Sequence, residues 1–264
     1  MRLTDLKPYF TVKSSPFRAQ PLSAIKPLAA EDVMVIFAPI SLSAVLPTAL
    51  LSRHERQRCE QFRFLEDRQR FLTCHAIKRV AIGQIMSIPP QELAFCTDSR
   101  RKPKLRDNAM FFNLSHSGKW IAVALCANRE IGVDVQSTPH NGIELPWGML
   151  RHPDECCSYD MTSFLRIWTL KEAASKCCGK GLTLDFTTLY TQNAGPTGYQ
   201  CLAGIYRWYA CHFKLACGTA ISVAAESAWR RLRLVRISQP FTHIIDKTVG
   251  RPLAAHQIVC ERRR

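Results

Sequence analysis

The feature that most constrains the fold is a change of hydrophobic period between residues 131–136 and residues 165–176. In the first segment apolar and polar side chains alternate, as they do in a strand with one buried face. In the second, apolar and charged positions recur every three or four residues, as on one stripe of a helix. The sequence therefore predicts a strand and then a helix. The positions concerned are Ile131, Gly132, Val133, Asp134, Val135 and Gln136 in the strand, and Leu165, Trp168, Glu172 and Lys176 in the helix.

The predicted strand and helix carry the candidate catalytic groups. Asp134 and Gln136 project on the same side of the strand, and Glu172 lies on the helix stripe that carries Trp168. A carboxylate on an apolar stripe needs a partner. Lys176, one turn on, could be that partner, and so could a cation that Asp134 also reaches. Mg²⁺ prefers hard oxygen ligands such as these carboxylates. The residues alone therefore allow two interpretations, an ordinary ion pair or a metal site.

The composition describes a globular protein with a strong positive charge. Of 264 residues, 47% are apolar, and 36 Lys+Arg against 21 Asp+Glu give a net charge of +15. Such a charge steers association with polyanions or acidic proteins. It fits nucleic acid, an anionic membrane surface, or an acidic carrier protein together with coenzyme A, and does not choose among them.

The cysteines indicate a reducing compartment. The chain has twelve, and two pairs are adjacent in sequence (156–157 and 177–178), a spacing that rarely permits an ordinary disulfide. Cys211, His212 and Cys217 lack a second half that would complete a zinc site. Residues 1–30 lack the apolar core of a signal sequence. We therefore expect reduced, mostly buried thiols and a cytoplasmic location.

The remaining segments are assigned by pattern. Val33 to Leu51 is apolar enough for a membrane span, but Pro39 and Pro47 interrupt it. A strand over 33–38 and a helix from about residue 47 are predicted instead. The other expectations are an ill-ordered lead-in at 1–30, a helix over 51–85, a helix over 164–178 that stops at Gly179, strands over 206–215 and 219–224, and a solvated or partly ordered basic tail over 228–264.

Ser115, His116 and Ser117 follow a predicted strand and could suggest a nucleophile with its base. They lack the G-x-S-x-G elbow of the serine hydrolases. A lone histidine after a strand is usually structural, so the residues alone do not assign it a role.

Three motifs carry a resemblance to a known family. They are F-N-[IL]-S-H-S at 112–117, G-[IV]-D-x-E at 132–136, and W-x-x-K-E-A at 168–173. In this order and at this spacing the chain resembles the 4′-phosphopantetheinyl transferases, over about residues 33–226. These enzymes move phosphopantetheine from coenzyme A to a serine of an acyl or peptidyl carrier protein.

The resemblance implies the fold. It is an α+β fold of two similar subdomains related by a pseudo-twofold, usually monomeric, with coenzyme A in the cleft between the halves. We place the seam after Gln136. The expected division is a lead-in at 1–30, an N-terminal subdomain at 31–136, a C-terminal subdomain at 137–226, and a basic extension at 227–264.

The resemblance also implies the metal site. Asp134, Gln136 and Glu172 would hold Mg²⁺, and Asp134, Glu172 and Lys176 would be the catalytic residues. Glutamine stands at 136 where the family commonly has glutamate. An amide oxygen can still bind a hard cation but brings no charge, so we expect weaker metal binding.

Contacts to coenzyme A follow from the same likeness. The matching positions are Arg58, Arg70, Lys102, Pro103, Ser115, His116 and Lys171. Arginine suits a phosphate because its planar fork donates hydrogen bonds in pairs. Arg101 stands where the family's G-K-P turn has glycine, which tolerates positive φ more readily. An acidic residue in 150–155 resembles one near the metal or the carrier, and it is either Asp154 or Glu155.

The implied function is transfer of 4′-phosphopantetheine from coenzyme A to a serine of an apo carrier protein, dependent on Mg²⁺, with release of 3′,5′-ADP. One alternative is a non-catalytic module that binds coenzyme A or a carrier. Another is a basic nucleic-acid-binding protein, although no nucleic-acid motif accompanies the scattered arginines. No membrane span or nucleic-acid partner is expected, and the carrier itself is left open.

Overall fold

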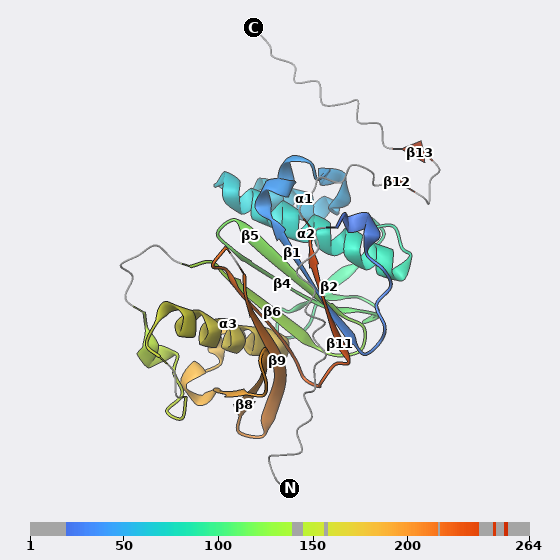
Figure 1. The fold of residues 1–264 in the computed structure, drawn as a ribbon. Helices are drawn as coiled ribbons and strands as arrows, with labels where there is room; N and C mark the ends of the chain where they lie inside the picture. The colour runs from blue at the N-terminus through green and yellow to red at the C-terminus, as the bar shows by residue number, and fades with distance from the viewer. Residues whose placement is uncertain are drawn as a thin grey trace.

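The computed structural model describes residues 20–138, 145–155, 158–215 and 217–237, together with two short strands at 245–246 and 251–252. The α-helices of this described part are α1 (Arg53–Glu60), α2 (Leu65–Met86) and α3 (Met161–Cys178) (Figure 1). No helix within these ranges combines the length and the apolar character needed to cross a membrane.

The first sheet has the strand order β11-β1-β5-β4. β1 pairs antiparallel with β5, and β5 pairs antiparallel with β4, whereas β11 runs parallel to β1. Its central strands are buried on both faces, which explains their continuous apolar runs. The strands are β1 (Asp32–Pro39), β4 (Phe111–Ser117), β5 (Trp120–Cys126) and β11 (Arg231–Arg236), and a separate hairpin is formed by β2 (Phe95–Thr97) and β3 (Pro103–Leu105).

The second sheet is antiparallel throughout, in the order β6-β10-β9-β8-β7. Its strands are β6 (Ile131–Gln136), β7 (Tyr190–Asn193), β8 (Gly198–Ala203), β9 (Tyr206–Lys214) and β10 (Ala220–Ala225). A third, two-stranded pairing joins β12 (Ile245–Asp246) to β13 (Arg251–Pro252).

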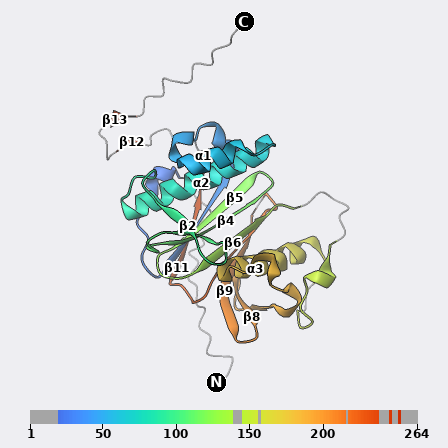
Figure 2. The same ribbon diagram turned by 180° about the vertical axis from the view of Figure 1, so that it is seen from behind.

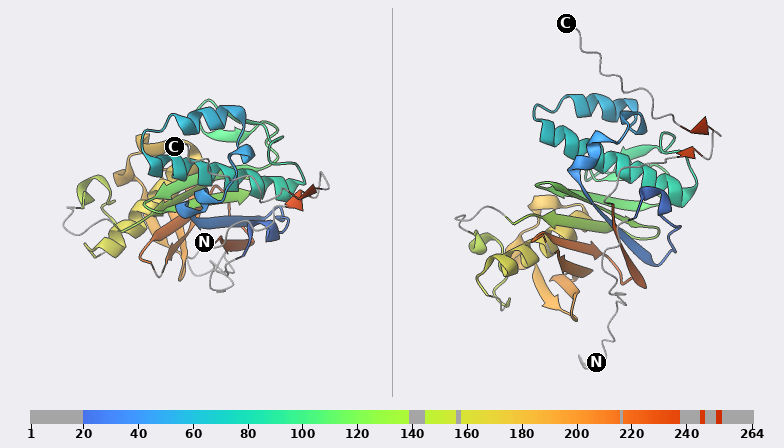
Figure 3. Two further views of the ribbon diagram at one scale, coloured as in Figure 1. Left: turned by 90° about the horizontal axis from the view of Figure 1, so that it is seen from above. Right: turned by 45° about the horizontal axis from the view of Figure 1, so that its top comes forward.

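The elements form four layers, helix, sheet, sheet and helix. α2 packs on one face of the first sheet, and α3 packs on the outer face of the second (Figure 3). The inner faces of the two sheets share one apolar core, to which β1 contributes Val33 and Val35 and β6 contributes Val133. Since burial of such a side chain stabilises by roughly 1.5–3 kcal/mol, this core joins the halves firmly.

The sheets meet where β4 and β6 lie side by side (Figure 2). Side chains rather than a backbone ladder join the two strands there. Alternate side chains of β4 accept hydrogen bonds from alternate backbone N–H groups of residues 133–137. Val133 donates to Asn113 Oδ1 (3.0 Å), Val135 to Ser115 Oγ (3.2 Å), and Ser137 to Ser117 Oγ (3.0 Å). The polar residues of the F-N-x-S-H-S motif therefore hold β4 against β6.

Several predictions from the sequence are confirmed. Apolar residues of β6 enter the core between the sheets, so Asp134 and Gln136 share the opposite side, toward α3. α3 is capped at its N-terminus by Asp160, whose carboxylate accepts from Ser163 N (2.8 Å), and at its C-terminus by Gly179, whose φ is 72°. The strand predicted over 33–38 and the two predicted near 206–215 and 219–224 are present.

The predicted helix over 51–85 is wrong in one respect, because it is two helices. α1 starts at Arg53, is capped by Ser52 through a capping box with Glu55, and ends at Glu60. After a short break at 61–64 the chain begins α2, which ends at Met86 and is followed by Ser87 in the left-handed conformation. The sequence carried a capping signal for α1, which the helical pattern alone did not reveal.

The seam predicted after Gln136 is also misplaced. β6 lies in the second sheet, so the chain passes between the sheets at residues 127–130 rather than beyond 136. The physical reason is that β6 pairs its backbone with β10, whereas only side chains link it to β4.

Both expected extensions are partly folded. In the lead-in, residues 1–19 lie outside the described residues, but Leu22 and Ile25 are buried in the core of the first half. In the tail, residues 231–236 form β11, and Leu232 and Val235 are buried. The interpretation of 228–264 as a solvated extension is therefore wrong for this strand, whose partner β1 lies far away in sequence.

Most of the described cysteines are buried, as the sequence predicts. Nine of them are free, and burial raises the pKa of Cys74, Cys201 and Cys211 to about 12. The pair at 156–157 lies outside the described residues. Cys211 and His212 are successive on β9, so they point to opposite faces, and they do not form a zinc site together.

Candidate active site

Asp134 is the centre of the candidate site. Its side chain is almost wholly buried, and Oδ1 accepts hydrogen bonds from Ser115 Oγ (2.8 Å) and Lys176 Nζ (2.6 Å). Oδ2 is also buried, yet it has no hydrogen-bond partner among the described residues. A carboxylate oxygen withdrawn from water without a partner is unfavourable, so this atom is ready to accept a ligand.

Glu172 lies one turn of α3 before Lys176 and is half-buried. Burial raises the pKa of its carboxyl group. The charge of Lys176 opposes that shift and the charge of Asp134 adds to it. The charge of Asp134 acts on Glu172 because the two carboxylates lie close together, and such a pair attracts a cation.

Lys176 connects the helix to both strands. Its ammonium donates to Ser115 Oγ (3.1 Å) on β4 and to Asp134 Oδ1 (2.6 Å) on β6. An ammonium has three hydrogens, and no third acceptor for this one is found within the described ranges. A phosphate oxygen could take that hydrogen.

His116 and Arg70 lie beside this group. His116 follows Ser115 on β4 and is exposed, and its pKa is lowered by partial desolvation and by the positive charges of Arg70 and Lys176. Arg70 Nε donates to Gly118 O (3.1 Å), while its other nitrogens bind Asp67 (2.6 Å) and Glu66 (2.7 Å). The guanidinium is therefore held at the turn that follows His116.

Lys171 behaves differently from its neighbour Glu172. Its side chain is fully buried, and Nζ donates to Leu150 O (2.7 Å), Phe186 O (2.8 Å) and Glu155 Oε2 (2.9 Å). These bonds use all three ammonium hydrogens. A contact between Lys171 and coenzyme A stays a prediction, and these protein groups would have to release it.

The same bonds bear on the choice between Asp154 and Glu155. Glu155 is buried, and its second oxygen accepts from Thr191 N (2.8 Å) and Thr191 Oγ1 (2.6 Å). Asp154 is exposed, and its carboxylate lies 3.8 Å from His152 Nδ1. Glu155 is thus the partner of Lys171, and neither residue joins the carboxylates of Asp134 and Glu172.

The other predicted contacts are spread out. Lys102 Nζ has three acceptors inside the protein, and Pro103 is exposed at the start of β3. Arg58 is exposed on α1, with its guanidinium carbon 5.8 Å from the centroid of the Phe71 ring. The structure brings together Ser115, His116, Asp134, Glu172, Lys176 and Arg70, but not Lys171 or Lys102.

The donor set fits a hard divalent cation. The bare Oδ2 of Asp134 and the neighbouring carboxylate of Glu172 offer two charged oxygens, and Gln136 lies two residues along the same face of β6. No group of three His, Cys, Asp or Glu side chains gathers in the described residues. The third ligand from protein would then be the Gln136 amide oxygen.

Comparison with known proteins identifies the family. A model described as 4′-phosphopantetheinyl transferase, N-terminal, matches residues 37–128, and one described as the 4′-phosphopantetheinyl transferase superfamily matches residues 130–224. The boundary between the two matches falls where the chain passes from the first sheet to the second. The chain belongs to the 4′-phosphopantetheinyl transferase superfamily.

Curated members of the superfamily are similar over part of their length. A putative 4′-phosphopantetheinyl transferase of Synechocystis sp. is 33% identical over 51% of this chain and 59% of its own. The 4′-phosphopantetheinyl transferase HetI of Nostoc sp. is 35% identical over 51% and 62%, and a 4′-phosphopantetheinyl transferase of Bacillus subtilis is 30% identical over 52% and 63%. The chain thus spans about three fifths of the length of these relatives.

Two features of this superfamily member were missed in the sequence. The alternation of Asn113, Ser115 and Ser117 along β4 is a period-2 signal for a polar face, and it could have predicted the junction with β6. Gly132 was noted only as part of a motif. A Cβ atom there would lie 2.0 Å from Ala173 O and 2.5 Å from Cys177 N, so only glycine lets α3 lie directly on β6.

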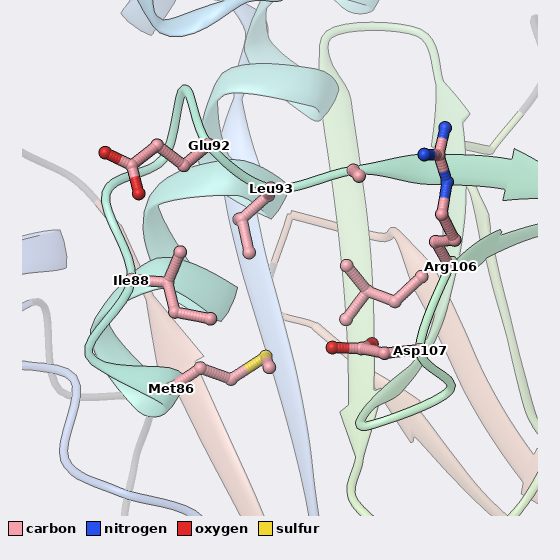
Figure 4. A pocket seen from close by; sticks show the side chains of 8 residues that line it. Met86, Ile88, Glu92, Leu93, Arg106 and Asp107 are labelled. Atoms are coloured by element: carbon pink, nitrogen blue, oxygen red, sulfur yellow. The ribbon is translucent and has the colours of Figure 1, made fainter.

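A pocket elsewhere in the first half is separate from this site (Figure 4). Its volume is about 270 Å³, and Met86, Ile88 and Leu93 form an apolar lining, with the carboxylates of Glu92 and Asp107 on opposite sides. Its lining residues include none of the predicted site residues.

Proposed function

We propose that this protein transfers 4′-phosphopantetheine from coenzyme A to a serine of an apo carrier protein, with Mg²⁺, and releases 3′,5′-ADP. The observation that carries the proposal is the junction of Asp134, Glu172 and Lys176, with one bare carboxylate oxygen, in a member of this superfamily. A cytoplasmic, monomeric protein is part of the proposal, and free cysteines are consistent with a reducing compartment.

Anionic substrates are drawn to the site by charge. The net charge of +15 favours both coenzyme A and carriers with acidic surfaces. Lys176 offers its remaining ammonium hydrogen to the pyrophosphate, and Arg70 and His116 lie on the same side. Ser115 orients Asp134 through its hydroxyl group. Substrate binding is thus assigned to groups from both halves.

Proton transfer is assigned to Glu172. In the reaction the carrier serine Oγ forms a bond to the β-phosphorus, the phosphoanhydride bond breaks, and 3′,5′-ADP departs with the bonding electron pair. The serine proton passes to the Glu172 carboxylate, directly or through water. Because burial and Asp134 raise the pKa of Glu172, this carboxylate is a stronger base than an exposed glutamate.

Asp134 and Glu172, with the Gln136 amide, are the residues that would hold Mg²⁺. When bound, the cation would neutralise the negative charge that builds on the phosphate oxygens. Asp134 is pre-oriented for this by two hydrogen bonds to Oδ1, which leave Oδ2 available. Lys176 partly neutralises the pair of carboxylates in the meantime.

The test is intact-protein mass spectrometry of apo carrier proteins after incubation with this protein, coenzyme A and Mg²⁺, with a chelator control. Carriers of fatty-acid, polyketide and peptide synthesis are compared side by side. Coenzyme A binding is measured in parallel by isothermal titration calorimetry. Glu92→Gln serves as a matched control because Glu92 is an exposed carboxylate in the separate pocket.

We expect wild type and Glu92→Gln to add one phosphopantetheine to a carrier, and to do so only when the metal is present. If no carrier is modified although coenzyme A binds, the binding-only alternative replaces the enzyme. If coenzyme A does not bind either, the assignment of this site is overturned.

A further inference from the structure

The loop at residues 98–102 is shaped to present two basic side chains to the second half. Asp98 Oδ1 accepts from the backbone N–H of Arg100 (2.9 Å) and of Lys102 (2.8 Å). Arg101 takes a φ of 62°, the conformation that glycine favours. The turn of the family's G-K-P motif is therefore formed here despite the arginine, and it directs Arg100 and Lys102 toward α3.

The end of α3 receives those side chains. The last four carbonyls of a helix lack partners within it. Here Ser175 O and Lys176 O accept from the backbone N–H groups of Lys180 (3.2 Å) and Gly179 (3.3 Å). The remaining two, Cys177 O and Cys178 O, accept from Lys102 Nζ (2.8 Å) and from Arg100 Nη1. Two cations from the first half thus cap the negative end of the helix dipole.

Lys102 also reaches the start of β6. Its ammonium donates to Ile131 O (3.0 Å) and to Glu130 Oε2 (2.6 Å), in addition to Cys177 O. The side chain is 9% exposed. All three hydrogens are in use, so this lysine ties the β2–β3 hairpin, β6 and α3 together at one point.

That point lies next to the reacting groups. Cys177 follows Lys176, and Ile131 lies three residues before Asp134. α3 rests directly on β6 at Gly132, where no side chain cushions a shift. A small displacement of the helix end would therefore change the 2.6 Å contact between Lys176 Nζ and Asp134 Oδ1.

We infer that Lys102, supported by Arg100, is a positioning residue that fixes α3 on β6 from the opposite half of the protein. This inference rests on the proposed function, since it concerns the geometry of that same site. Lys102, the lysine of the R-K-P turn, then serves the protein interior. The phosphate contact that the resemblance implies for this lysine is made by other residues. The site thereby depends on both halves even where no ligand is bound.

The experiment compares Lys102→Met, Lys102→Arg and Arg100→Met with two references. Lys104→Met removes a charge two residues along the chain, where no hydrogen-bond partner is found in the described part. Arg70→Met removes a cation on the ligand side. Each protein is measured well below its melting temperature for kcat, for KM and Kd of coenzyme A, and for amide hydrogen exchange of residues 131–136 and 170–180 without ligand.

For Lys102→Met we expect kcat to fall about 10- to 100-fold, because a misplacement near 1 Å has such an effect. The Kd for coenzyme A should stay within about twofold of wild type, while exchange rises in both segments. Lys102→Arg should recover most of kcat, Arg100→Met should show a smaller loss, and Lys104→Met should match wild type.

The inference is overturned if Lys102→Met raises the Kd for coenzyme A as much as Arg70→Met does and leaves hydrogen exchange unchanged. It is also overturned if only the melting temperature falls and the folded variant keeps its kcat. Should Lys102→Met fail to fold, Lys102→Arg and Arg100→Met answer the same question. Failure of the proposed function is seen separately, as wild-type protein that neither binds coenzyme A nor modifies a carrier.

Discussion

Two groups of buried charge on α3 differ in how completely they are satisfied. Lys171 has three acceptors, and both oxygens of its partner Glu155 are hydrogen-bonded. One residue further on, Glu172 faces Asp134, and Asp134 Oδ2 has no partner in the part of the chain that the structure describes. Neighbouring positions of one helix thus belong to two different kinds of site.

The difference separates support from chemistry. A buried ion pair with every hydrogen bond made holds loops in place and leaves no atom for a ligand. The carboxylates of Asp134, with its bare oxygen, and of Glu172, with its raised pKa, are unfavourable side by side in the free protein. A bound cation would stabilise them. Incomplete satisfaction, more than burial, therefore marks the candidate site.

The largest expected effect is on catalysis, from Asp134→Asn. The change keeps the shape of the side chain but removes the charge that would hold the metal, so we expect kcat/KM for carrier modification to fall on the order of 10²–10³-fold. Glu172→Gln should act similarly by removing the base. Both are measured by the mass-spectrometric transfer assay.

Stability is the control for this prediction. Asp134 is ion-paired with Lys176 (2.6 Å), so Asp134→Asn should lower the urea midpoint, and transfer is measured well below that midpoint. Near-normal transfer by either folded variant would show that these carboxylates are not the site.

Lys171→Met tests the other group. Removing the cation leaves Glu155 buried without a counter-charge, so we expect the free energy of unfolding to fall by about 3–5 kcal/mol. Urea titration followed by circular dichroism measures it. Lys180→Met, which removes an exposed lysine just beyond α3, should stay within about 0.5 kcal/mol of wild type.

A double mutant, Lys171→Met with Glu155→Gln, sharpens the result. If the two residues act as a pair, the double variant should lose less stability than the sum of the single variants. Additive losses, or a reduced affinity for coenzyme A in folded Lys171→Met, would move Lys171 from the supporting group to the ligand site.

A smaller effect concerns the pH dependence of stability and a half-buried histidine. His212 bonds Ser222 Oγ (3.0 Å) beneath α3, and burial, with Arg166 and Lys214 adding, lowers its pKa to about 4. Between pH 6.5 and 4 the unfolded chain therefore binds a proton that the folded chain does not. Stability should fall with falling pH there, by up to about 1.4 kcal/mol per pH unit from this residue.

Glu172 should act with the opposite sign, because a raised carboxyl pKa favours proton uptake by the folded state as the pH falls. His212→Asn keeps a hydrogen-bonding group near Ser222 but cannot titrate, so urea titrations at several pH values should show a shallower loss. Burial also lowers the pKa of His75 to about 4, so the loss of stability that comes from His75 would remain in this variant. If stability fell as steeply with pH in His212→Asn as in wild type, His212 would not be the source of this pH dependence.

The smallest expected effect is Arg101→Gly. Arginine at a φ of 62° carries a strain of about 1–2 kcal/mol, and glycine would relieve it while losing about 0.5–1 kcal/mol of chain entropy. We expect a net gain of roughly 0.5–1 kcal/mol in the free energy of unfolding. Asn108→Gly, at a φ of 53°, should gain less because asparagine tolerates this conformation. Equal gains would argue against strain at Arg101.

What could be predicted from the sequence was local. The alternation in 131–136 fixed which side Asp134 faces, and the spacing of Glu172 and Lys176 placed them on one stripe of α3. The separate fate of Lys171 could not be predicted, because its acceptors at 150, 155 and 186 come from loops with no periodic pattern. The capping of α3 by residue 102 depends on a contact 75 residues away in sequence.

The parallel pairing of β11 with β1 has a consequence for biosynthesis. Asp32 and Arg231, which are paired across these strands, are 199 residues apart. At 5–20 residues per second, β1 emerges from the ribosome roughly 10–40 s before its partner, and one of its edges stays open for that time. An open edge can pair with another nascent chain. A fragment cut between the halves would keep that edge permanently, so production of the first half alone should yield aggregates.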